Sequence, residues 1–420
     1  MKVLVIGSGG REHALAWQCA SFNIVEHVFV APGNAGTALE EKISNIEIES
    51  SEIEALIEFA INEAIDITIV GPEAPLVAGI VDDFRAHDLA IFGPTKAASQ
   101  LEGSKVFCKD FLKRNNIPTA FYEVFTEQES AISYVKEKGV PIVIKADGLA
   151  AGKGVIVAKT EQEAIEAIDD MLKGNLFGKA GSRVVIEEFL VGEEASFIVM
   201  VDGNNVLPMA TSQDHKARDN ADKGPNTGGM GAYSPAPVVN PSIFDDVIKS
   251  IIKKTVDAMS AEGSPYTGFL YAGLMINNGK AKVLEYNCRF GDPETQPIMM
   301  RLKSNLAQLC LLASQGKLDE ALIEWDERVS LGVVLAANGY PNDYKKGEKI
   351  TVPVDSDNTK IFHAGTKLDS NNIVSNGGRV LCATALGNSI QEAQKRAYEL
   401  VDRVDWHTSY YRTDIGFKAL

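Results

Sequence analysis

The chain has 420 residues, and its 41 Lys and Arg against 57 Asp and Glu give a formal net charge of −16 at pH 7. This balance excludes a chain whose main role is to coat nucleic acid or an anionic membrane. No apolar run approaches the roughly 18 residues of a membrane helix. The residues 1–10 read as a strand running into glycines, not as a signal peptide. Five scattered cysteines without a Cys-x-x-Cys pair predict reduced thiols in the cytoplasm, with neither disulfides nor zinc.

The first hundred residues alternate short apolar runs with helical patterns, which predicts a parallel sheet wrapped by helices. The expected strands lie at 3–6, 28–30, 67–70 and 90–92, and the expected helices at 12–19, 52–63 and 76–85. Gly-Pro pairs follow two of these strands. Ligands of such sheets gather beyond the carboxyl ends of the strands, so we expect a binding site at this edge.

From residue 103 the pattern changes to a compact α+β unit and then to longer strands. A helix is expected over 104–115, followed by strands at 122–125, 142–145, 155–158 and 184–187 with helices at 127–137 and 161–172. Further on we expect a helix at 244–261, strands at 331–336, 360–364 and 380–385, and a last helix at 390–402. The predicted segments are 1–103, a linker and helix at 104–121, then 122–190, 191–326 and 327–420.

A glycine-rich turn follows the first strand and opens a helix. The backbone N–H groups of Gly9 and Gly10, together with Arg11, suit a phosphate group. The dinucleotide fingerprint requires a glycine at position 12, where Glu12 stands, and this disfavours NAD or FAD. A second turn at 32–37 is expected at the same sheet edge. A tight turn without any ligand remains the alternative.

The segment from Lys145, KADGLAAGKGV, resembles a phosphate-binding P-loop but departs from it twice. Only three residues separate Gly148 from Gly152, and Gly154 follows Lys153 where Ser or Thr is required. The loop also joins two strands, whereas a P-loop leads into a helix. We interpret it as a flap that closes over phosphates with its backbone amides, and the alternative is a mobile exposed hairpin.

The acidic segment 187–194, EEFLVGEE, lies between two expected strands. It fits an adenine clamp, in which backbone groups contact the base and a carboxylate accepts from ribose hydroxyls. A solvated acidic loop explains the pattern equally well, so both interpretations stay open.

A second polar cluster follows the apolar strand at 281–284. Glu285 and Asn287 are two residues apart on a strand and therefore point to the same side. A carboxylate and an amide oxygen in this arrangement suit a hard cation such as Mg²⁺ bridging phosphates. Arg289 is expected on the same side, whereas Cys288 points away and packs.

Residues 213–216, QDHK, and 224–233 form a long polar glycine-rich stretch. Loops of this kind are usually functional or disordered. His215 is a possible general base, although an isolated histidine in a loop more often forms hydrogen bonds.

The order of flap, acidic hinge and Glu-x-Asn strand resembles the ATP-grasp ligases. The motifs GSGGREHALA, APGNAGT, VGPEAPL, LEGSK, IVIKADGLAAGKGV, SQDHK, GPNTGGMGAYSP, EYNCRFGDPETQ, NGGRVL and YYRTDIG span essentially the whole chain. They resemble the glycinamide ribonucleotide synthetase family in particular. The resemblance implies a multidomain α/β and α+β fold, with an N-terminal Rossmann-like parallel sheet, an ATP-grasp core with a mobile lid and a C-terminal mixed α/β domain.

The resemblance also implies three groups of site residues. The residues implied to hold ATP are Lys105, Lys145, Gly148, Gly152, Lys153, Gly154, Glu187, Glu188, Phe189, Leu190 and Glu194. Mg²⁺ or Mn²⁺ is implied at Glu285 and Asn287. The residues implied to line the phosphoribosylamine and glycine region are Gly9, Gly10, Arg11, Glu12, Asn34, Asp214, His215, Lys216, Asn226, Thr227, Gly228, Gly229, Arg289, Gly291, Asp292 and Pro293. Those implied to be catalytic are Arg289, Lys145 and Asp292. The preceding strand, 271–275, departs from many ATP-grasp enzymes because it supplies no further metal carboxylate.

The implied reaction joins glycine to 5-phosphoribosylamine in de novo purine biosynthesis. ATP converts the glycine carboxylate to glycyl phosphate, and the amine then displaces phosphate, so that no side-chain nucleophile is required. A monomer is expected, with transient contacts to neighbouring enzymes of the pathway. The alternatives are an ATP-grasp carboxylase or formate-using purine enzyme, a dehydrogenase, and a non-catalytic nucleotide-binding module.

Overall fold

The computed structural model describes residues 1–148, 154–172 and 183–420. Its N-terminal sheet is parallel, in the order β3-β2-β1-β4-β5, which confirms the expected parallel sheet. Both faces of this sheet are covered, and residues 3–6 are accordingly fully buried. The strands are β1 (Lys2–Gly7), β2 (His27–Pro32), β3 (Ile43–Asn45), β4 (Ile67–Val70) and β5 (Ile91–Phe92).

Helices connect and cover these strands. They are α1 (Gly10–Ala20), α2 (Ile53–Asn62), α3 (Glu73–Ala78) and α4 (Ile80–Ala86), with a short 3₁₀ turn, η1 (Thr37–Leu39). The single helix expected over 76–85 is wrong, because the chain breaks at Gly79. This glycine has φ +113°, a left-handed conformation that ends α3 and starts α4.

The next unit is a small antiparallel sheet with two helices, which we call the lid sheet. Two helices, α5 (Gln100–Gly103) and α6 (Lys105–Arg114), lead into it, and the Ser104 side chain caps α6. Its strand order is β6-β9-β7-β8. The elements are β6 (Tyr122–Phe125), α7 (Gln128–Lys138), β7 (Ile142–Ala146), β8 (Val155–Ala158), α8 (Glu161–Leu172) and β9 (Val184–Glu188).

A second antiparallel sheet, in the order β11-β10-β16-β17, forms the centre of the molecule. Its strands are β10 (Glu193–Asp202), β11 (Val206–Pro208), β16 (Thr267–Asn277) and β17 (Lys280–Asn287). The long helix expected over 244–261 is confirmed, although a π-turn, η4 (Ile248–Ile252), joins α9 (Pro241–Val247) to α10 (Lys253–Ala261). After β17 follow α11 (Thr295–Arg301), α12 (Leu306–Ser314) and the turn η5 (Leu318–Glu320).

The C-terminal sheet recruits two strands from the middle of the chain. Its order is β12-β15-β18-β23-β20, with β24 added to β18. The strands are β12 (Gln213–Asp214), β15 (Gly231–Ser234), β18 (Val329–Ala337), β20 (Thr359–His363), β23 (Arg379–Gly387) and β24 (Ser409–Tyr410), and α13 (Ile390–Val401) covers them. The expected segment 191–326 is therefore joined by hydrogen bonds to the segment that follows it.

The remaining elements are small. A hairpin of β13 (Ala217–Asp219) and β14 (Lys223–Asn226) encloses η3 (Asn220–Asp222). A three-stranded sheet holds β19 (Lys349–Ile350), β21 (Thr366–Asp369) and β22 (Asn372–Ser375), and η6 (Phe417–Ala419) closes the chain. Among the described residues, no helix combines the length and apolarity that a membrane crossing requires.

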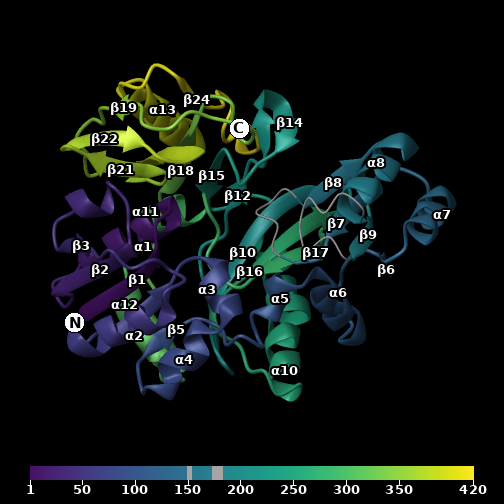
Figure 1. Cartoon of the computed structure of the whole chain (residues 1–420), viewed down its shortest axis with the longest axis horizontal. Helices are drawn as coiled ribbons and strands as arrows, with labels where there is room; N and C mark the ends of the chain where they lie inside the picture. The colour runs from purple at the N-terminus through teal and green to yellow at the C-terminus, as the bar shows by residue number, and fades with distance from the viewer. Residues whose placement is uncertain (149–153, 173–182) are drawn as a thin grey trace.

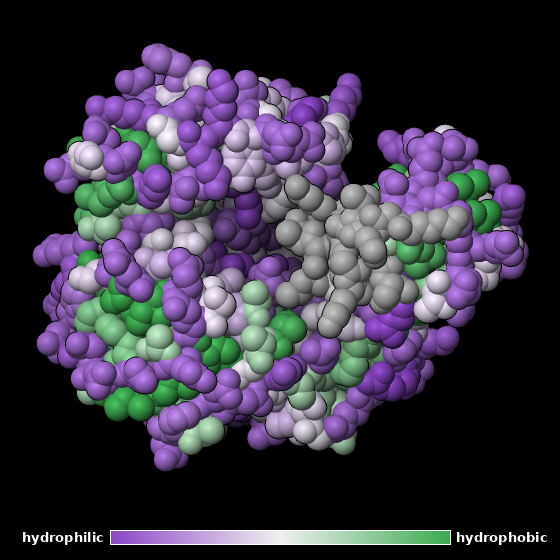
Figure 2. Space-filling model, in the orientation of Figure 1, coloured by the Kyte–Doolittle hydropathy of each residue, from purple (hydrophilic) through white to green (hydrophobic). Residues whose placement is uncertain are grey.

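The sheets surround a hollow in the molecule. In Figure 1 the lid sheet with α7 and α8 stands apart from the N-terminal and C-terminal sheets, and β10, β16 and β17 lie between them. Figure 2 shows hydrophilic residues lining the hollow beside the lid. The carboxyl ends of the N-terminal strands face this region, as the sequence predicts.

Candidate functional site

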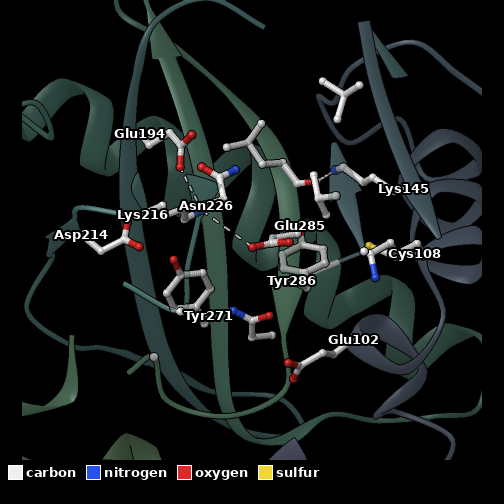
Figure 3. A pocket seen from close by; sticks show the side chains of 18 of the residues that line it. Glu102, Cys108, Lys145, Glu194, Asp214, Lys216, Asn226, Tyr271, Glu285 and Tyr286 are labelled. Carbon is white, nitrogen blue, oxygen red and sulfur yellow. Dashed lines mark hydrogen bonds and ion pairs between the residues drawn. The ribbon is translucent and has the colours of Figure 1, made fainter. Parts of the chain in front are cut away.

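The main cleft has a volume of about 510 Å³ and runs from the lid sheet across β17 to the loops after β12 and β14. It brings together most of the residues singled out from the sequence, although they come from three sheets. Those that line it are Arg11, Lys105, Lys145, Gly148, Gly154, Glu187, Glu188, Phe189, Leu190, Glu194, Asp214, Lys216, Asn226, Thr227, Gly228, Glu285, Asn287, Arg289, Gly291 and Asp292. Figure 3 shows how several of these side chains converge.

The glycine-rich segment joins two paired strands, as expected. Lys145 on β7 is in register with Val155 on β8, and the Ala146 N–H donates to the Gly154 carbonyl at 2.9 Å. Lys105 Nζ donates to the Gly148 carbonyl at 2.8 Å, so the first turn of α6 holds the start of the loop. The predicted contacts Gly152 and Lys153 lie outside the described residues.

A buried row of charges lies beneath the lid. Glu187 at the end of β9 places its carboxylate 2.8 Å from Lys109 Nζ and 3.0 Å from Lys145 Nζ. Burial by itself lowers the pKa of Lys145, but the carboxylates of Glu187 and Glu285 outweigh it and the pKa is raised. Lys145 therefore stays charged at the inner end of β7, where a phosphate can reach it.

The carboxylates of the acidic hinge after β9 lie in different surroundings, and Glu194 lines the cleft, so a ribose contact by this segment stays a prediction. The Glu187 carboxylate is occupied by two lysines and is not available to ribose hydroxyls. Glu188 accepts from Lys282 Nζ at 3.3 Å. The surfaces left to meet a flat base are the hinge backbone and an apolar wall that contains Val143, Val157, Leu190, Met275 and Leu284.

Glu285 and Asn287 lie on the cleft side of β17, as predicted. The pairing of β16 with β17 shifts register between Gly273 and Leu274, and beyond this irregularity the alternation continues with Tyr286 buried. Lys216 Nζ lies 3.9 Å from the Glu285 carboxylate (Figure 3). Burial by itself raises the pKa of Glu285, but lysines around it reverse the effect and the pKa is lowered, so that the group is a carboxylate at neutral pH.

The fit to a divalent cation rests on this pair alone. Among the residues that the structure describes, no group of three or more His, Cys, Asp or Glu is arranged to hold a metal ion. One carboxylate and one amide oxygen are too few for a closed protein cage, but they suit Mg²⁺ or Mn²⁺ that takes its other ligands from phosphates and water. The donor chemistry therefore fits the predicted group.

Arg289 is held in place by two acidic residues that were not among the predicted site residues. Its Nη2 lies 2.8 Å from Glu102 Oε1, and its Nε lies 3.3 Å from Glu73 Oε2. Burial by itself lowers the pKa of Arg289, but these carboxylates raise it above its ordinary value. The guanidinium is thus a fixed cation at the inner end of the cleft.

The glycine-rich stretch after β12 presents alternate residues to the cleft. Lys216 Nζ pairs with Glu194 at 2.9 Å, and Asp214 lies beside it (Figure 3). Burial raises the pKa of Asp214 to about 7, with Lys216 opposing that shift. The carboxyl group can therefore exchange a proton near neutral pH.

The prediction that His215 binds substrate is wrong for this structure. Its side chain is fully buried on the opposite side of the strand, between the rings of Tyr233 and Phe417. Its Nε2 accepts from the Gly416 N–H at 3.2 Å. Burial, reinforced by nearby Arg412, lowers its pKa to about 3, and the ring is neutral. It has the hydrogen-bonding role that the sequence analysis kept as the alternative.

A second cavity of about 640 Å³ lies between the N-terminal loops and the small C-terminal sheet. Gly9 and Asn34 line it on one side, and residues 364–368 line it on the other. It shares Asp292, Tyr340 and Arg379 with the main cleft. Arg379 Nη1 donates to the Asp292 carbonyl at 2.6 Å, so the two cavities meet at this pair.

Several predicted substrate contacts support the loops but line neither cavity. Glu12 accepts from the Gly9 N–H at 2.6 Å and from Arg11 Nε at 2.5 Å, and it is almost completely buried. It therefore occupies the amide that a dinucleotide phosphate would need, which counts against the dehydrogenase alternative. Gly10 lies against Gln296, and Gly229 lies against Pro293. Direct contact of Gly10, Glu12 and Gly229 with a substrate stays a prediction.

The structure also adds residues that the sequence analysis did not assign to the site. They are Glu73, Glu102, Lys109, Glu294, Tyr340 and Arg379. Glu73, Glu102 and Arg379 lie within the motifs VGPEAPL, LEGSK and NGGRVL, so a signal existed for them. Another motif, YYRTDIG, does not line the cleft but supports it. Its buried Arg412 donates to the Ala217 carbonyl at 3.1 Å and pairs with Asp222, which fixes the hairpin of β13 and β14 beside Lys216.

The paired strands β7 and β8 carry a buried lysine, and β17 of the central sheet presents a carboxylate and an amide to the same cleft; this arrangement is typical of an ATP-grasp enzyme. The likeness in fold extends to a biotin carboxylase from Campylobacter jejuni, with a TM-score of 0.74, 15% identity, and coverage of 96% of this chain and 91% of that chain. The chain belongs to the phosphoribosylglycinamide synthetase family and is an ATP-dependent ligase. The family models match residues 1–102 (N domain), 103–295 (ATP-grasp domain) and 330–418 (C domain).

Individual relatives agree with this assignment. A phosphoribosylamine–glycine ligase from Vibrio cholerae is 65% identical over 423 residues, covering 100% of this chain and 99% of that protein. The ligase of the same name from Escherichia coli K12 is 64% identical over 424 residues, with the same coverage. A crystal structure of phosphoribosylamine–glycine ligase from Thermotoga maritima has a TM-score of 0.86 and 36% identity, covering 99% of this chain and 100% of that chain.

Proposed function

We propose that this chain joins the carboxyl group of glycine to the amine of 5-phosphoribosylamine, with ATP cleaved to ADP and phosphate, in de novo purine biosynthesis. The observation that carries the proposal is the meeting of two cavities at Asp292 and Arg379. One cavity has the features of an ATP-grasp cleft. The other is open to a second, polar substrate, and the junction lies where the two must react.

The lid side of the main cleft is the proposed nucleotide site. The base packs against Leu190, Met275 and neighbouring apolar residues, and the phosphates extend toward Lys105 and Lys145. The Lys105 side chain already donates to the Gly148 carbonyl, so this cation, which is proposed to bind phosphate, is tied to the residues that follow β7. Backbone amides of the loop between β7 and β8 supply donors to phosphate oxygens.

Glu285 and Asn287 would hold a Mg²⁺ or Mn²⁺ ion. When bound, a divalent cation of this kind neutralises charge on the β- and γ-phosphates of the nucleotide. Two protein ligands leave room for phosphate oxygens and water. The neighbouring Lys216, 3.9 Å from Glu285, adds a cation to the same place.

The two chemical steps need alignment more than a reactive side chain. A glycine carboxylate oxygen attacks the γ-phosphorus of ATP, the bond to the β,γ-bridging oxygen breaks, and ADP leaves with that electron pair. The phosphoribosylamine nitrogen then attacks the carbonyl carbon of glycyl phosphate, the carbon–oxygen bond breaks, and phosphate leaves. The amine proton passes to phosphate or to water. Arg289 and Lys216 stabilise the charge that develops on the transferred phosphoryl group.

The second cavity is the proposed site of phosphoribosylamine. Glu12 already accepts from the Gly9 N–H on one side of this cavity, so the phosphate group is expected at Lys367 on the other side. The shared residues Asp292 and Arg379 would then direct the amine toward the main cleft. The acyl phosphate between the two cavities is shielded from water by the lid sheet.

The test is phosphate release from ATP with glycine and freshly made phosphoribosylamine supplied together and singly. We expect rapid release only with both substrates, with one phosphate and one ADP for each amide formed. Release that does not depend on phosphoribosylamine would contradict the proposal. A dependence on bicarbonate or formate in place of glycine would support a related ATP-grasp enzyme instead.

We further propose that the chain works in the cytoplasm as a monomer with transient contacts to neighbouring enzymes. The large apolar side chains that remain exposed, such as Leu322, Val354 and Phe121, come from separate parts of the chain. Sedimentation at micromolar concentration distinguishes a monomer from a stable dimer.

A further inference from the structure

One buried carboxylate connects three consecutive residues at the end of the proposed metal strand. Glu102, on the short helix α5, has a side chain only 9% exposed. Its Oε2 accepts from the Cys288 N–H at 2.7 Å and lies 3.0 Å from Cys288 Sγ. Its Oε1 accepts from Arg289 Nη2 at 2.8 Å, and one end of the Asn287 amide lies 3.1 Å from it, where only an NH₂ group can form a hydrogen bond. Figure 3 shows Glu102 below Tyr286 and Glu285.

The contact with Asn287 decides which end of the amide faces the cleft. An amide has one oxygen and one NH₂ group, and only the oxygen can bind a cation. A carboxylate and a carbonyl accept hydrogen bonds but cannot donate them, so the end of Asn287 that lies 3.1 Å from Glu102 Oε1 and 3.2 Å from the Tyr286 carbonyl is assigned as the NH₂ group, with Glu102 as its charged acceptor. The Asn287 oxygen is thereby left for the cleft, on the side where Glu285 lies.

Arg289 pairs with two acidic residues through different nitrogens of its guanidinium group, and their other contacts distinguish their roles. Glu102 binds Nη2, whereas Glu73 binds Nε at 3.3 Å. Of these two, only Glu102 also contacts Asn287 and the backbone of Cys288. Removal of Glu73 therefore disturbs Arg289 alone, and removal of Glu102 disturbs the amide, the strand end and Arg289 together.

We propose that Glu102 is a positioning residue that fixes the amide oxygen of Asn287 toward the divalent cation and Arg289 toward the transferred phosphoryl group. The inference rests on the proposed function, because it assigns a role toward the cation site at Glu285 and Asn287. Loss of an outer group that orients a metal ligand typically lowers metal affinity or activity by about 10- to 100-fold. The acidic residue of the LEGSK motif thus acts 186 positions further along the chain, at Cys288 and its two neighbours.

The experiment measures Mn²⁺ affinity by electron paramagnetic resonance in the presence of saturating ADP. E102Q removes the charge of the side chain and replaces one of its two acceptor oxygens by an NH₂ group, so Asn287 and Arg289 lose the charge-assisted hydrogen bonds that orient them. We expect Mn²⁺ to bind about 10- to 100-fold more weakly. In the double variant E102Q/N287D the hydrogen bond is reversed, because Gln donates to Asp and either end of Asp is an oxygen. We expect this variant to recover most of the lost affinity.

The matched control is E73Q, which removes the other partner of Arg289. It should lower the rate of phosphate release while Mn²⁺ affinity stays at the wild-type value. Circular dichroism verifies folding; should E102Q not fold, E102D, which keeps the charge but withdraws it from Asn287, is expected to show the same loss. Unchanged Mn²⁺ affinity in E102Q, or no recovery in E102Q/N287D, would overturn the role of Glu102. A wild-type chain that binds no Mn²⁺ with ADP would instead refute the cation site.

Discussion

The buried carboxylate of Glu187 offers the sharpest test of how the lid is held together. It lies between Lys109 at 2.8 Å and Lys145 at 3.0 Å, and all three side chains are at most 8% exposed. Each pair has a Coulomb attraction of roughly 6 kcal/mol at an effective dielectric constant near 20, and desolvation offsets most of it. Glu187→Gln keeps the shape but leaves two cations without a counter-charge. We expect it to destabilise the lid sheet by about 3 to 5 kcal/mol at pH 7.

A pH series separates this explanation from a simple packing defect. In the variant, the buried lysines lose their counter-ion, and the pKa of at least one falls below the unfolded value of about 10.4. The unfolded chain then binds more protons than the folded chain in that interval. Stability therefore rises with pH, and the deficit relative to the wild type shrinks between pH 7 and 10. A packing defect would leave the deficit constant.

Hydrogen exchange of the peptide that contains β9 is the suitable assay, because a chain with several sheets need not unfold in one step. The matched control is Lys109→Met, which removes one cation and leaves the pair of Lys145 and Glu187 intact. Thr119 loses its contact with Lys109 but still donates to the Val283 carbonyl at 2.7 Å. The control should therefore cost only about 1 to 2 kcal/mol. Equal losses in the two variants, or a Glu187→Gln lid as stable as the wild type, would refute the reasoning.

Three further predictions concern binding, turnover and acid stability. Lys145→Ala should weaken binding of ADP with Mg²⁺ by about tenfold or more in calorimetry, since it removes the charge proposed to meet a phosphate; unchanged affinity would reject that contact. Glu285→Ala should abolish Mg²⁺-dependent phosphate release, and near-normal turnover at low Mg²⁺ would reject the metal assignment. Burial lowers the pKa of His215 and of His363 to about 3, so each stays neutral when folded and is protonated when unfolded. Stability is thus lost as the pH falls from about 6.5 toward 3, by about 2 kcal/mol per histidine at pH 5. Thermal unfolding of the chain and of His215→Gln between pH 7.5 and 5 measures that slope, which the substitution should reduce.

The sequence could predict whatever depends on local periodicity. The alternation of strands and helices anticipates the N-terminal parallel sheet, and the glycine loop between apolar runs anticipates the hairpin of β7 and β8. The same-side placement of Glu285 and Asn287 was predicted from the two-residue repeat, and it holds because the strand irregularity lies before Glu285. These features depend on neighbours within a few residues.

Contacts between distant segments could not be predicted in this way. Glu102 meets Cys288 and Arg379 meets Asp292 only because separate sheets pack against each other. No local sequence pattern predicts which acidic residue will pack against the end of which strand. The long-range geometry follows from tertiary packing, which propensity and periodicity do not encode.

His215 shows a prediction that local reasoning could have improved. Asp214 pairs with Ala232 in the C-terminal sheet, and this extended backbone sends Asp214 and Lys216 to the cleft and His215 to the opposite side. The two-residue alternation applied at Glu285 predicts that result here as well. An irregular loop, as expected for this segment, has no such alternation, so the buried position of His215 was not predicted.

The acidic net charge of the chain extends into the site itself. Among the described residues, seven basic and nine acidic side chains line the main cleft. Most of these lysines and arginines are already paired with carboxylates, as Lys216 is with Glu194 and Arg289 is with Glu102. Paired cations are rigid and do not repel one another in the empty cleft, but they provide little net attraction for a polyanion. A nucleotide must then bring positive charge with it to offset its phosphates. This gives a physical reason why an acidic chain with two candidate metal ligands would bind ATP as its complex with a divalent cation.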